Sequence, residues 1–324
     1  MRTALIGCGY WGTAIARTIA DMDELDLVAV YDRDRSAGES VAHLCGAVQA
    51  EHLEDLLDGD VAAVLIATSS ESHYEVALRC LEAGKHAFVE KPFTTNLEHA
   101  RDLLRIAKAN GLTCMVDHIF LYSEAVRKLK DMVDGGEFGQ LVYVTCRRIN
   151  LGIPRYFTDV IWDLAVHDLS VIDYLFGLDV DRVLVSRMRH ASFPDDAIAN
   201  ITLDLQGGIH ANIAVSYLSP VKIREMVIGG THRMAVYDDT KRDKLLIFDK
   251  GIVFSDQLDA EGLRGQMAGY KYGQTSTPSL IRKPPLTTAL QHFAESVLEG
   301  KEPLSGSRSI LNVMRALDLI SKSR

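Results

Sequence analysis

Residues 1–118 alternate short apolar runs with stretches whose apolar residues recur at helical spacing. The apolar runs lack the polar alternation of a half-exposed strand and therefore predict strands buried on both faces. They are Ala4–Ile6, Val28–Tyr31, Val61–Ala67, Ala87–Glu90 and Thr113–Val116. The helical stretches are Thr13–Ala20, Ser36–Cys45, Glu51–Leu57, Glu71–Ala83 and Leu97–Ala109. This alternation, with short connections, predicts a parallel, doubly wound sheet with right-handed crossovers.

Two of these helices carry end signals. Gly84 directly follows Glu71–Ala83, where a left-handed residue commonly ends a helix. Thr95 and Glu98 have the spacing of a capping box, which predicts that Thr95 opens the next helix.

Residues 119–324 follow a different pattern, in which alternating segments succeed one another without helices between them. The predicted strands are Leu141–Arg147, Arg182–Arg189, Ile198–Leu205, Ile209–Tyr217, Glu225–Ile228, Arg233–Tyr237 and Leu245–Phe248. Predicted helices cover Ser123–Val133, Val160–Phe176, Leu286–Leu298 and a last segment from about Ile310. Gln206-Gly207-Gly208 predicts a hairpin turn, and Asp256–Pro285 an extended loop or lid. We therefore expect a largely antiparallel sheet and two domains, at residues 1–118 and 119–324.

Composition supports this division and excludes several partners. The chain has 324 residues, beyond the roughly 250–300 at which a single core stops growing. Its formal charge of −9 disfavours binding to nucleic acid or to anionic membranes. No apolar run approaches the ~18–20 residues of a membrane span, and the glycines from Gly7 onward interrupt a secretion signal. The five cysteines form no CxxC pair, so we expect neither disulfides nor a metal site, and a cytoplasmic protein.

The segment Gly7-Cys8-Gly9-Tyr10-Trp11-Gly12 is a GxGxxG motif between a predicted strand and a predicted helix. In that context the three glycines predict a turn that lets a dinucleotide pyrophosphate approach the helix N-terminus. Asp32 ends the second strand, 20 residues after Gly12, where a carboxylate can accept the ribose hydroxyls of NAD and repel the 2′-phosphate of NADP. Arg33 and Arg35 weaken that preference, because guanidinium groups can hold a phosphate. We expect NAD rather than NADP.

Two further motifs carry candidate chemistry. Glu90-Lys91-Pro92 ends the predicted strand Ala87–Glu90, which places an ammonium group at the sheet edge where ligands gather. Asp163 and His167 are spaced i and i+4 on a predicted helix, so the carboxylate can orient the imidazole as a general base. Taken alone, each motif is more often a surface ion pair than a catalytic group.

Together these motifs resemble the Gfo/Idh/MocA oxidoreductase family, named for glucose–fructose oxidoreductase and inositol dehydrogenase. The resemblance covers nearly the whole chain: the glycine motif, Ala67-Thr68-Ser69 with His73, the segment Leu81 to Pro92, Trp162 to Asp168 and Gln291 to Pro303. It implies a Rossmann domain and a C-terminal α/β domain whose open sheet often forms homodimers or homotetramers. It also implies that Lys91, Asp163 and His167 are catalytic. The implied cofactor contacts are Gly7, Gly9, Tyr10, Trp11, Gly12, Asp32, Arg33, Thr68, Ser69, His73, Glu90 and Lys91.

The resemblance implies hydride transfer between a nicotinamide and a secondary hydroxyl or ketone of a sugar. Residues 116–123 and 147–152 are similar to a branch that acts on nucleotide sugars, by oxidation or ketone reduction at C3 of a UDP-N-acetylhexosamine. Asp159-Val-Ile-Trp162 departs from the glycine-rich sequence of many members. Expected substrate contacts are His118, Arg148, Asn150, Arg155 and Tyr156, with Arg147 a further candidate for a diphosphate. Alternatives are an inositol or free-monosaccharide dehydrogenase, and a noncatalytic NAD-binding redox sensor.

Overall fold

The chain divides into two units, each built around its own sheet. The computed structural model describes residues 1–323 except 153–158, 192, 194, 253–269 and 282. Unit 1 comprises Met1–Ser123 and Arg282–Asp318, and unit 2 comprises Glu124–Ile281 and Leu319–Arg324. The first boundary lies near the expected one after residue 118. The C-terminal segment differs from expectation, because residues up to Asp318 cluster with the N-terminal unit.

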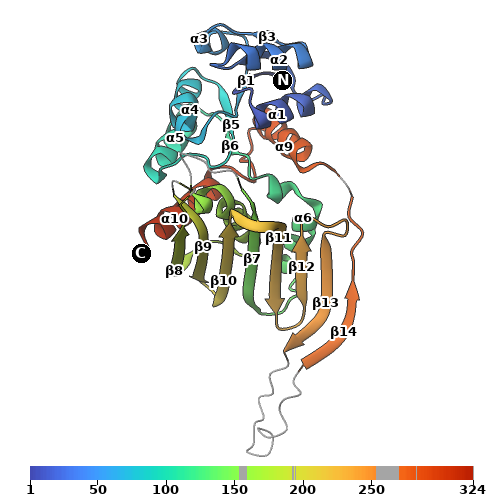
Figure 1. Cartoon of the computed structure of the whole chain (residues 1–324). Helices are drawn as coiled ribbons and strands as arrows, with labels where there is room; N and C mark the ends of the chain where they lie inside the picture. Colours follow the sequence, from blue (N-terminus) through green and yellow to red (C-terminus); the bar gives the residue numbers. More distant parts are fainter. Residues whose placement is uncertain (153–158, 192, 194, 253–269, 282, 324) are drawn as a thin grey trace, which may run out of the picture. The chain divides into compact units, whose positions relative to one another are not determined.

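Unit 1 contains a six-stranded parallel sheet of order β3-β2-β1-β4-β5-β6, the Rossmann order (Figure 1). Its strands are β1 (Arg2–Ile6), β2 (Asp26–Tyr31), β3 (Val48–Gln49), β4 (Ala63–Ile66), β5 (His86–Val89) and β6 (Cys114–Val116). Every residue of β4 and β6 is buried, as the predicted two-sided burial requires. The two-residue strand β3 was not predicted, because it is too short to carry a periodic signal.

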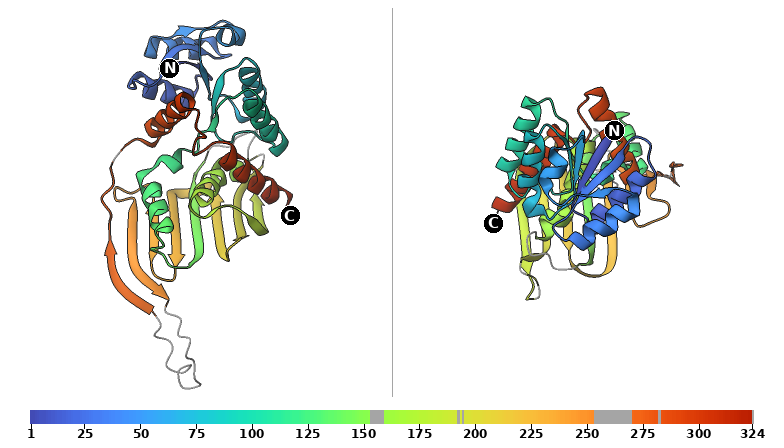
Figure 2. Two further views of the ribbon diagram at one scale, coloured as in Figure 1. Left: turned by 180° about the vertical axis from the view of Figure 1, so that it is seen from behind. Right: turned by 90° about the horizontal axis from the view of Figure 1, so that it is seen from above.

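Helices lie on both faces of this sheet (Figure 2). They are α1 (Tyr10–Ala20), α2 (Arg35–Cys45), α3 (Leu53–Leu57), α4 (His73–Glu82) and α5 (Leu97–Ala109), with 3-10 turns η1 (Ser70–Ser72) and η2 (Ile119–Tyr122). Gly84 follows α4 with φ +74°, as predicted. The prediction for the start of α5 was wrong by one residue. Asn96, not Thr95, is the N-cap, since its side-chain oxygen accepts the amides of Glu98 and His99.

The C-terminal helices complete unit 1. Helix α9 (Pro285–Glu299) packs on α1 and η2, and α10 spans Ser307–Lys322. Ser305 lies between them and clamps the end of β6: its carbonyl accepts the Val116 amide at 3.0 Å, and its hydroxyl donates to the Val116 carbonyl at 2.7 Å. This clamp ties residues near 305 to the last strand of the first sheet.

Unit 2 contains an eight-stranded, mostly antiparallel sheet of order β14-β13-β12-β11-β7-β10-β9-β8. Its strands are β7 (Leu141–Leu151), β8 (Val180–Arg189), β9 (Asp196–Leu205), β10 (Ile209–Ser216), β11 (Leu218–Gly230), β12 (Met234–Asp238), β13 (Leu245–Ile252) and β14 (Tyr270–Ser276). The predicted hairpin is confirmed, because Leu205 pairs with Ile209 across the glycine turn. The prediction of an extended loop or lid over Asp256–Pro285 was wrong for Tyr270–Ser276, which forms β14 and pairs with β13. Residues 256–269 of that segment lie outside the described residues.

Helices α6 (Glu124–Asp134) and α7 (Val166–Phe176) lie against one face of this sheet (Figures 1 and 2). A π-helical turn, η3 (Ile161–Ala165), precedes α7. The predicted helix Val160–Phe176 is therefore present, but its first turn is wider than an α-helical turn. Within the described part of the chain, no helix is long and apolar enough to span a bilayer.

Candidate active site

The glycine motif forms a tight turn between β1 and α1. Gly7 has φ +94°, and a Cβ there would lie 2.5 Å from the carbonyl oxygen of Ala67, so both conformation and space require glycine. A Cβ on Gly12 would overlap the carbonyl oxygen of Gly7. Around Gly9, by contrast, a Cβ would meet nothing within 4 Å, which leaves open space at the amino end of α1. The turn therefore fits a pyrophosphate group seated on a helix N-terminus.

The strand order reverses between β1 and β4, which defines the switch point of this sheet. Ala67 donates its amide to the Ile6 carbonyl at 2.8 Å, and Gly7 donates to the Tyr31 carbonyl at 2.9 Å. These bonds hold the ends of β1, β2 and β4 together beside the glycine turn.

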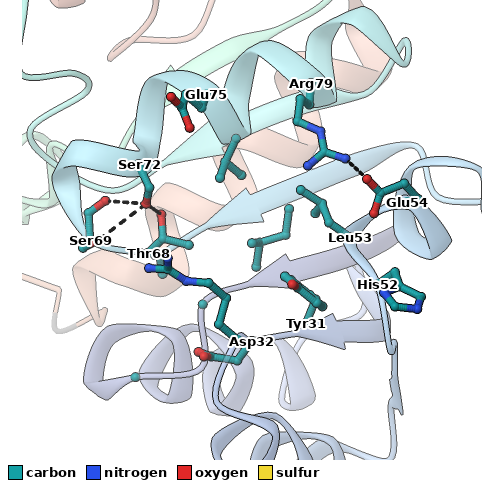
Figure 3. A pocket seen from close by; sticks show the side chains of 16 residues that line it. Tyr31, Asp32, His52, Leu53, Glu54, Thr68, Ser69, Ser72, Glu75 and Arg79 are labelled. Atoms are coloured by element: carbon teal, nitrogen blue, oxygen red, sulfur yellow. Dashed lines mark hydrogen bonds and ion pairs between the residues drawn. The ribbon is translucent and has the colours of Figure 1, made fainter.

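A pocket of about 540 Å³ opens at these strand ends (Figure 3). It is lined by Ile6, Gly7, Gly9, Tyr31, Asp32, Arg33, His52, Leu53, Glu54, Ala67, Thr68, Ser69, Ser72, Glu75, Val76 and Arg79. Six of the expected cofactor contacts are among them: Gly7, Gly9, Asp32, Arg33, Thr68 and Ser69. The pocket is of the size that small-molecule and cofactor sites commonly have.

Asp32 links this pocket to the glycine turn. Its Oδ2 accepts the amide of Cys8 at 2.6 Å, and its Oδ1 accepts the amide of Asp34 at 2.8 Å. The carboxylate therefore shapes the main chain on both sides of the pocket, in addition to presenting negative charge to it. Asp34 in turn caps α2, and hydrogen bonds from Ser36 and Ala37 lower its pKa.

Side chains close the remaining walls (Figure 3). Ser72 donates its hydroxyl to the Thr68 Oγ1 at 2.9 Å, which joins the loop after β4 to the start of α4. Arg79 of α4 forms an ion pair with Glu54 of α3. The pKa of Glu54 is lowered by its own backbone amide and by Arg79. The pocket thus carries charges of both signs.

The remaining expected cofactor contacts lie outside the lining of this pocket. Tyr10 and Trp11 lie in the first turn of α1, 85% and 36% exposed. His73 is buried, with its ring nitrogens 2.8 Å and 3.2 Å from the carbonyl oxygens of Pro92 and Thr68. Burial lowers the pKa of His73, and the hydrogen bonds to the Pro92 and Thr68 carbonyls oppose that shift. The ring lies between the Lys91-Pro92 segment and the loop after β4.

Glu90 and Lys91 lie at the carboxyl end of β5 in a buried cluster of ionisable groups. The Glu90 Oε2 accepts the Lys91 amide at 2.9 Å, and the Asp117 amide bonds to the Val89 carbonyl at 2.8 Å. The Asp117 carboxyl hydrogen-bonds to that of Glu90. Burial, and then the charge of Glu90, raise the pKa of Asp117 well above its usual range. The neighbouring His118 is 2% exposed, and burial lowers its pKa to about 3, so the ring is neutral.

In unit 2, Asp163 lies in η3 and His167 in the first turn of α7. Asp163 is 8% exposed, and its Oδ2 accepts a hydrogen bond of 2.9 Å from the Tyr217 hydroxyl. The next carboxylate, Asp168, is also buried and receives Nε and Nη2 of Arg148 at 2.8–3.3 Å. This helix start therefore holds two carboxylates with separate partners from the sheet.

The expected substrate contacts are dispersed. Arg148 is 4% exposed and bound to Asp168, and His118 is buried in unit 1, so neither presents an open binding group. Arg147 is exposed and pairs with Glu225 at 2.7 Å. Asn150 is half-buried on β7. Arg155 and Tyr156 lie outside the described residues.

Sequence reasoning missed two groups of residues in the described site. The first is the far wall of the pocket, formed by His52–Glu54, by Ser72 of η1 and by the α4 face of Glu75, Val76 and Arg79. A signal existed for that face, because its spacing is helical and the helix follows a predicted strand end. The second is Tyr217, for which no local pattern pointed to Asp163, 54 residues away.

Two family profiles match the chain. Residues 1–118 match the Gfo/Idh/MocA oxidoreductase family domain with an NAD-binding Rossmann fold, and residues 126–236 match the Gfo/Idh/MocA C-terminal domain. UDP-N-acetylglucosamine 3-dehydrogenase of Acidithiobacillus ferrooxidans is 32% identical over 240 residues, 74% of each chain. Inositol 2-dehydrogenase of Mycolicibacterium gilvum is 30% identical over 57% of this chain and 55% of that protein. Several other matches likewise cover about half of the relative's length.

A solved structure gives the same result for the fold. The UDP-N-acetylglucosamine 3-dehydrogenase GnnA from Acidithiobacillus ferrooxidans superposes with a TM-score of 0.84, at 24% identity, over 99% of this chain and 96% of that one. With both domains matched in sequence and the glycine turn, switch point and pocket present, the chain is an oxidoreductase of the Gfo/Idh/MocA family.

Proposed function

We propose that the chain is an NAD-dependent dehydrogenase that oxidises a secondary hydroxyl of a sugar, most specifically C3 of a nucleotide-linked amino sugar, or reduces the corresponding ketone. The observation that carries the proposal is the pocket at the β1/β4 switch point, bounded by Gly7, Gly9 and Asp32, in a chain of this oxidoreductase family. NAD supplies the hydride acceptor when bound.

NAD rather than NADP fits the charges around the pocket. The carboxylate of Asp32 lies at the end of β2, where it disfavours a 2′-phosphate. Arg35 is paired with Glu39 at 3.0 Å and lies 3.8 Å from Glu51, so its charge is already balanced. Arg33, which follows Asp32 and also lines the pocket, is therefore the arginine proposed to contact the adenosine part of the cofactor.

The catalytic set proposed is Lys91, Asp163 and His167. His167 accepts the proton of the substrate hydroxyl as the carbinol carbon gives up its hydride, and Asp163 orients the imidazole and stabilises its protonated form. Lys91 stabilises negative charge on the substrate oxygen as it becomes a carbonyl. In the alternative assignment, Lys91 and not His167 transfers the proton, and the same three residues are involved.

Two relatives favour two substrate classes. The relative matched over 74% of its length acts on a UDP-linked amino sugar, which favours a nucleotide sugar. The inositol dehydrogenase match favours a small polyol as the second candidate. A noncatalytic redox sensor would bind NAD without turnover.

We also propose a homodimer or homotetramer formed through the large sheet. Leu184 and Met188 of β8 are spaced by an even number of residues, so they share one face of the strand, and they are 55% and 46% exposed. Exposed apolar side chains on a broad strand surface are typical of a face covered by another subunit.

The test is NADH formation by the purified chain, measured by absorbance, with NAD or NADP. UDP-N-acetylglucosamine, its uronic acid and a dTDP-sugar are compared with glucose, galactose and myo-inositol, and a ketosugar acceptor releases any retained NADH. The Asp163→Asn/His167→Ala double variant serves as the blank.

We expect turnover with nucleotide sugars and NAD, and none in the blank. Turnover of myo-inositol or a free sugar instead would refute the nucleotide-sugar assignment. NAD binding without turnover of any sugar, unchanged in the double variant, would refute the enzyme and leave the sensor.

A further inference from the structure

Tyr217 lies at the junction of β10 and β11 and sends its hydroxyl to Asp163. The Oη–Oδ2 distance is 2.9 Å, and the two residues are only 3% and 8% exposed. A hydrogen bond from a buried hydroxyl to a carboxylate is stronger and more directional than the same bond in water. Oδ2 of Asp163 is therefore held by the sheet as well as by its own turn.

The tyrosine is itself fixed by the strands around it. Its amide donates to the Ala197 carbonyl at 2.9 Å, and its carbonyl accepts the Gly152 amide at 2.9 Å. Its ring stacks on Phe193 at 5.7 Å between centroids and 12° between planes. A Cβ on Gly152 would overlap the ring, so glycine at the end of β7 is what admits the phenol.

Asp163 needs such an anchor because of the turn that carries it. It lies in the π-helical turn η3, a form that is rare and common at functional sites. Asp159 precedes the turn, and its Oδ1 accepts the amides of Ile161 and Trp162 at 2.9 Å each. Asp159 fixes the backbone of the turn, and Tyr217 fixes the carboxylate.

We propose that Tyr217 is a positioning residue that holds the Asp163 carboxylate in the orientation from which it supports His167. The inference rests on the proposed function, in which Asp163 and His167 act as a pair. It assigns a role in that function to a residue of the sheet that neither the glycine motif nor the Asp-x-x-x-His spacing includes.

Tyr217→Phe tests the role, because it keeps the ring and its stacking and removes only the hydroxyl. With NAD and UDP-N-acetylglucosamine, or myo-inositol if that is the sugar oxidised, we expect kcat to fall about tenfold and the KM for NAD to stay within twofold. The acidic limb of the kcat–pH profile should move to lower pH, since a misplaced carboxylate stabilises the protonated imidazole less.

A second readout does not depend on turnover. In 15N-histidine spectra of the full chain, the His167 titration is assigned by its loss in His167→Ala. Its midpoint should move to lower pH in Tyr217→Phe and in Asp163→Asn. The matched control is Tyr122→Phe, which removes a buried hydroxyl bonded to Ser305 at 3.1 Å in unit 1 and should leave the midpoint unchanged.

A double-mutant cycle separates this inference from the proposed function. If Tyr217 acts through Asp163, adding Tyr217→Phe to Asp163→Asn should cause less than a twofold further loss. Full additivity, or an unchanged profile and midpoint in Tyr217→Phe while Asp163→Asn and His167→Ala are impaired, would overturn the inference alone. Wild-type activity in those last two variants would instead overturn the proposed function.

Gly152→Ala is the second variant in case Tyr217→Phe does not fold. It keeps the hydroxyl but displaces the ring, so the same shift of the His167 midpoint is expected. An unchanged midpoint in a folded Gly152→Ala variant would count against the inference.

Discussion

The candidate sites of the two units are formed by different kinds of group. In unit 1 the pocket opens at strand ends beside a turn of main chain, with Gly7 and Gly9 in its lining and Asp32 accepting the amides of Cys8 and Asp34. In unit 2 the candidate catalytic residue Asp163 is a buried carboxylate bound to Tyr217, and the neighbouring Asp168 is a buried carboxylate bound to Arg148. A main-chain site is damaged by adding atoms, whereas a buried-charge site is damaged by removing a partner.

The largest expected effect comes from unit 2. Arg148→Met leaves the Asp168 carboxylate buried without its cation, and we expect a loss of about 3–5 kcal/mol of unfolding free energy. Urea denaturation followed by circular dichroism measures it.

Two controls sharpen that result. Arg147→Met, next to it on β7, breaks an exposed pair with Glu225 and should cost less than about 1 kcal/mol. The double variant Arg148→Met/Asp168→Leu should regain most of the loss, because no buried charge remains. Equal losses for Arg147 and Arg148 would contradict the contrast between exposed and buried pairs.

The second-largest effect is expected in unit 1, where an alanine substitution adds a Cβ to a glycine of the turn. Gly7→Ala places a Cβ against the Ala67 carbonyl at a positive φ, and we expect a loss of about 1–3 kcal/mol in the unliganded chain. Gly9→Ala meets no atom within 4 Å, so its unliganded Tm should equal that of the wild type, while its affinity for NAD falls at least tenfold. Calorimetry with and without NAD separates the two. A lowered unliganded Tm in Gly9→Ala would show that this space is structural and is not reserved for a ligand.

The third prediction concerns the buried cluster of Glu90, Asp117 and His118 next to Lys91, whose contribution to stability depends on pH. Burial, and then the charge of Glu90, raise the pKa of Asp117 above its ordinary value of 3.8. At pH values between the ordinary pKa and the raised one, Asp117 is protonated in the native chain and ionised in the unfolded chain. Wild-type stability therefore falls as pH rises through this window. Asp117→Asn lacks this loss, so its Tm relative to wild type should rise with pH and then level off. Thermal scans from pH 4 to pH 8 measure it, and a difference independent of pH would show that Asp117 is ionised throughout.

The smallest expected effect concerns the ion pair at the pocket wall. Arg79 and Glu54 are 43% and 61% exposed, so solvent screens their attraction. Glu54→Gln should leave the Tm nearly unchanged and alter NAD affinity less than threefold, as measured by fluorescence titration. A loss comparable to that in Gly9→Ala would mean that Glu54 contacts the cofactor directly.

The sequence anticipated the sheet of unit 1 better than the helix start of unit 2. Strands such as β4 are buried on both faces and flanked by helices, so their apolar runs were unambiguous. The strand β14 was missed because Tyr270–Ser276 is polar and rich in turn-forming residues, and its pairing with β13 decides its state. Thr95 was predicted as the cap of α5, whereas the structure shows Asn96 in that position. The position of the cap depends on where the backbone turns into the helix, and composition does not specify that residue.

The sequence by itself determined the doubly wound fold, the glycine turn and the family, because these depend on the local order of apolar runs and on residues a few positions apart. Only the tertiary structure decided that residues up to Asp318 join the first unit, that Arg148 is neutralised by Asp168, and that Tyr217 holds Asp163. Each of these is a contact between segments at least 20 residues apart. Its energy depends on burial and direction, and neither quantity exists until the chain has folded.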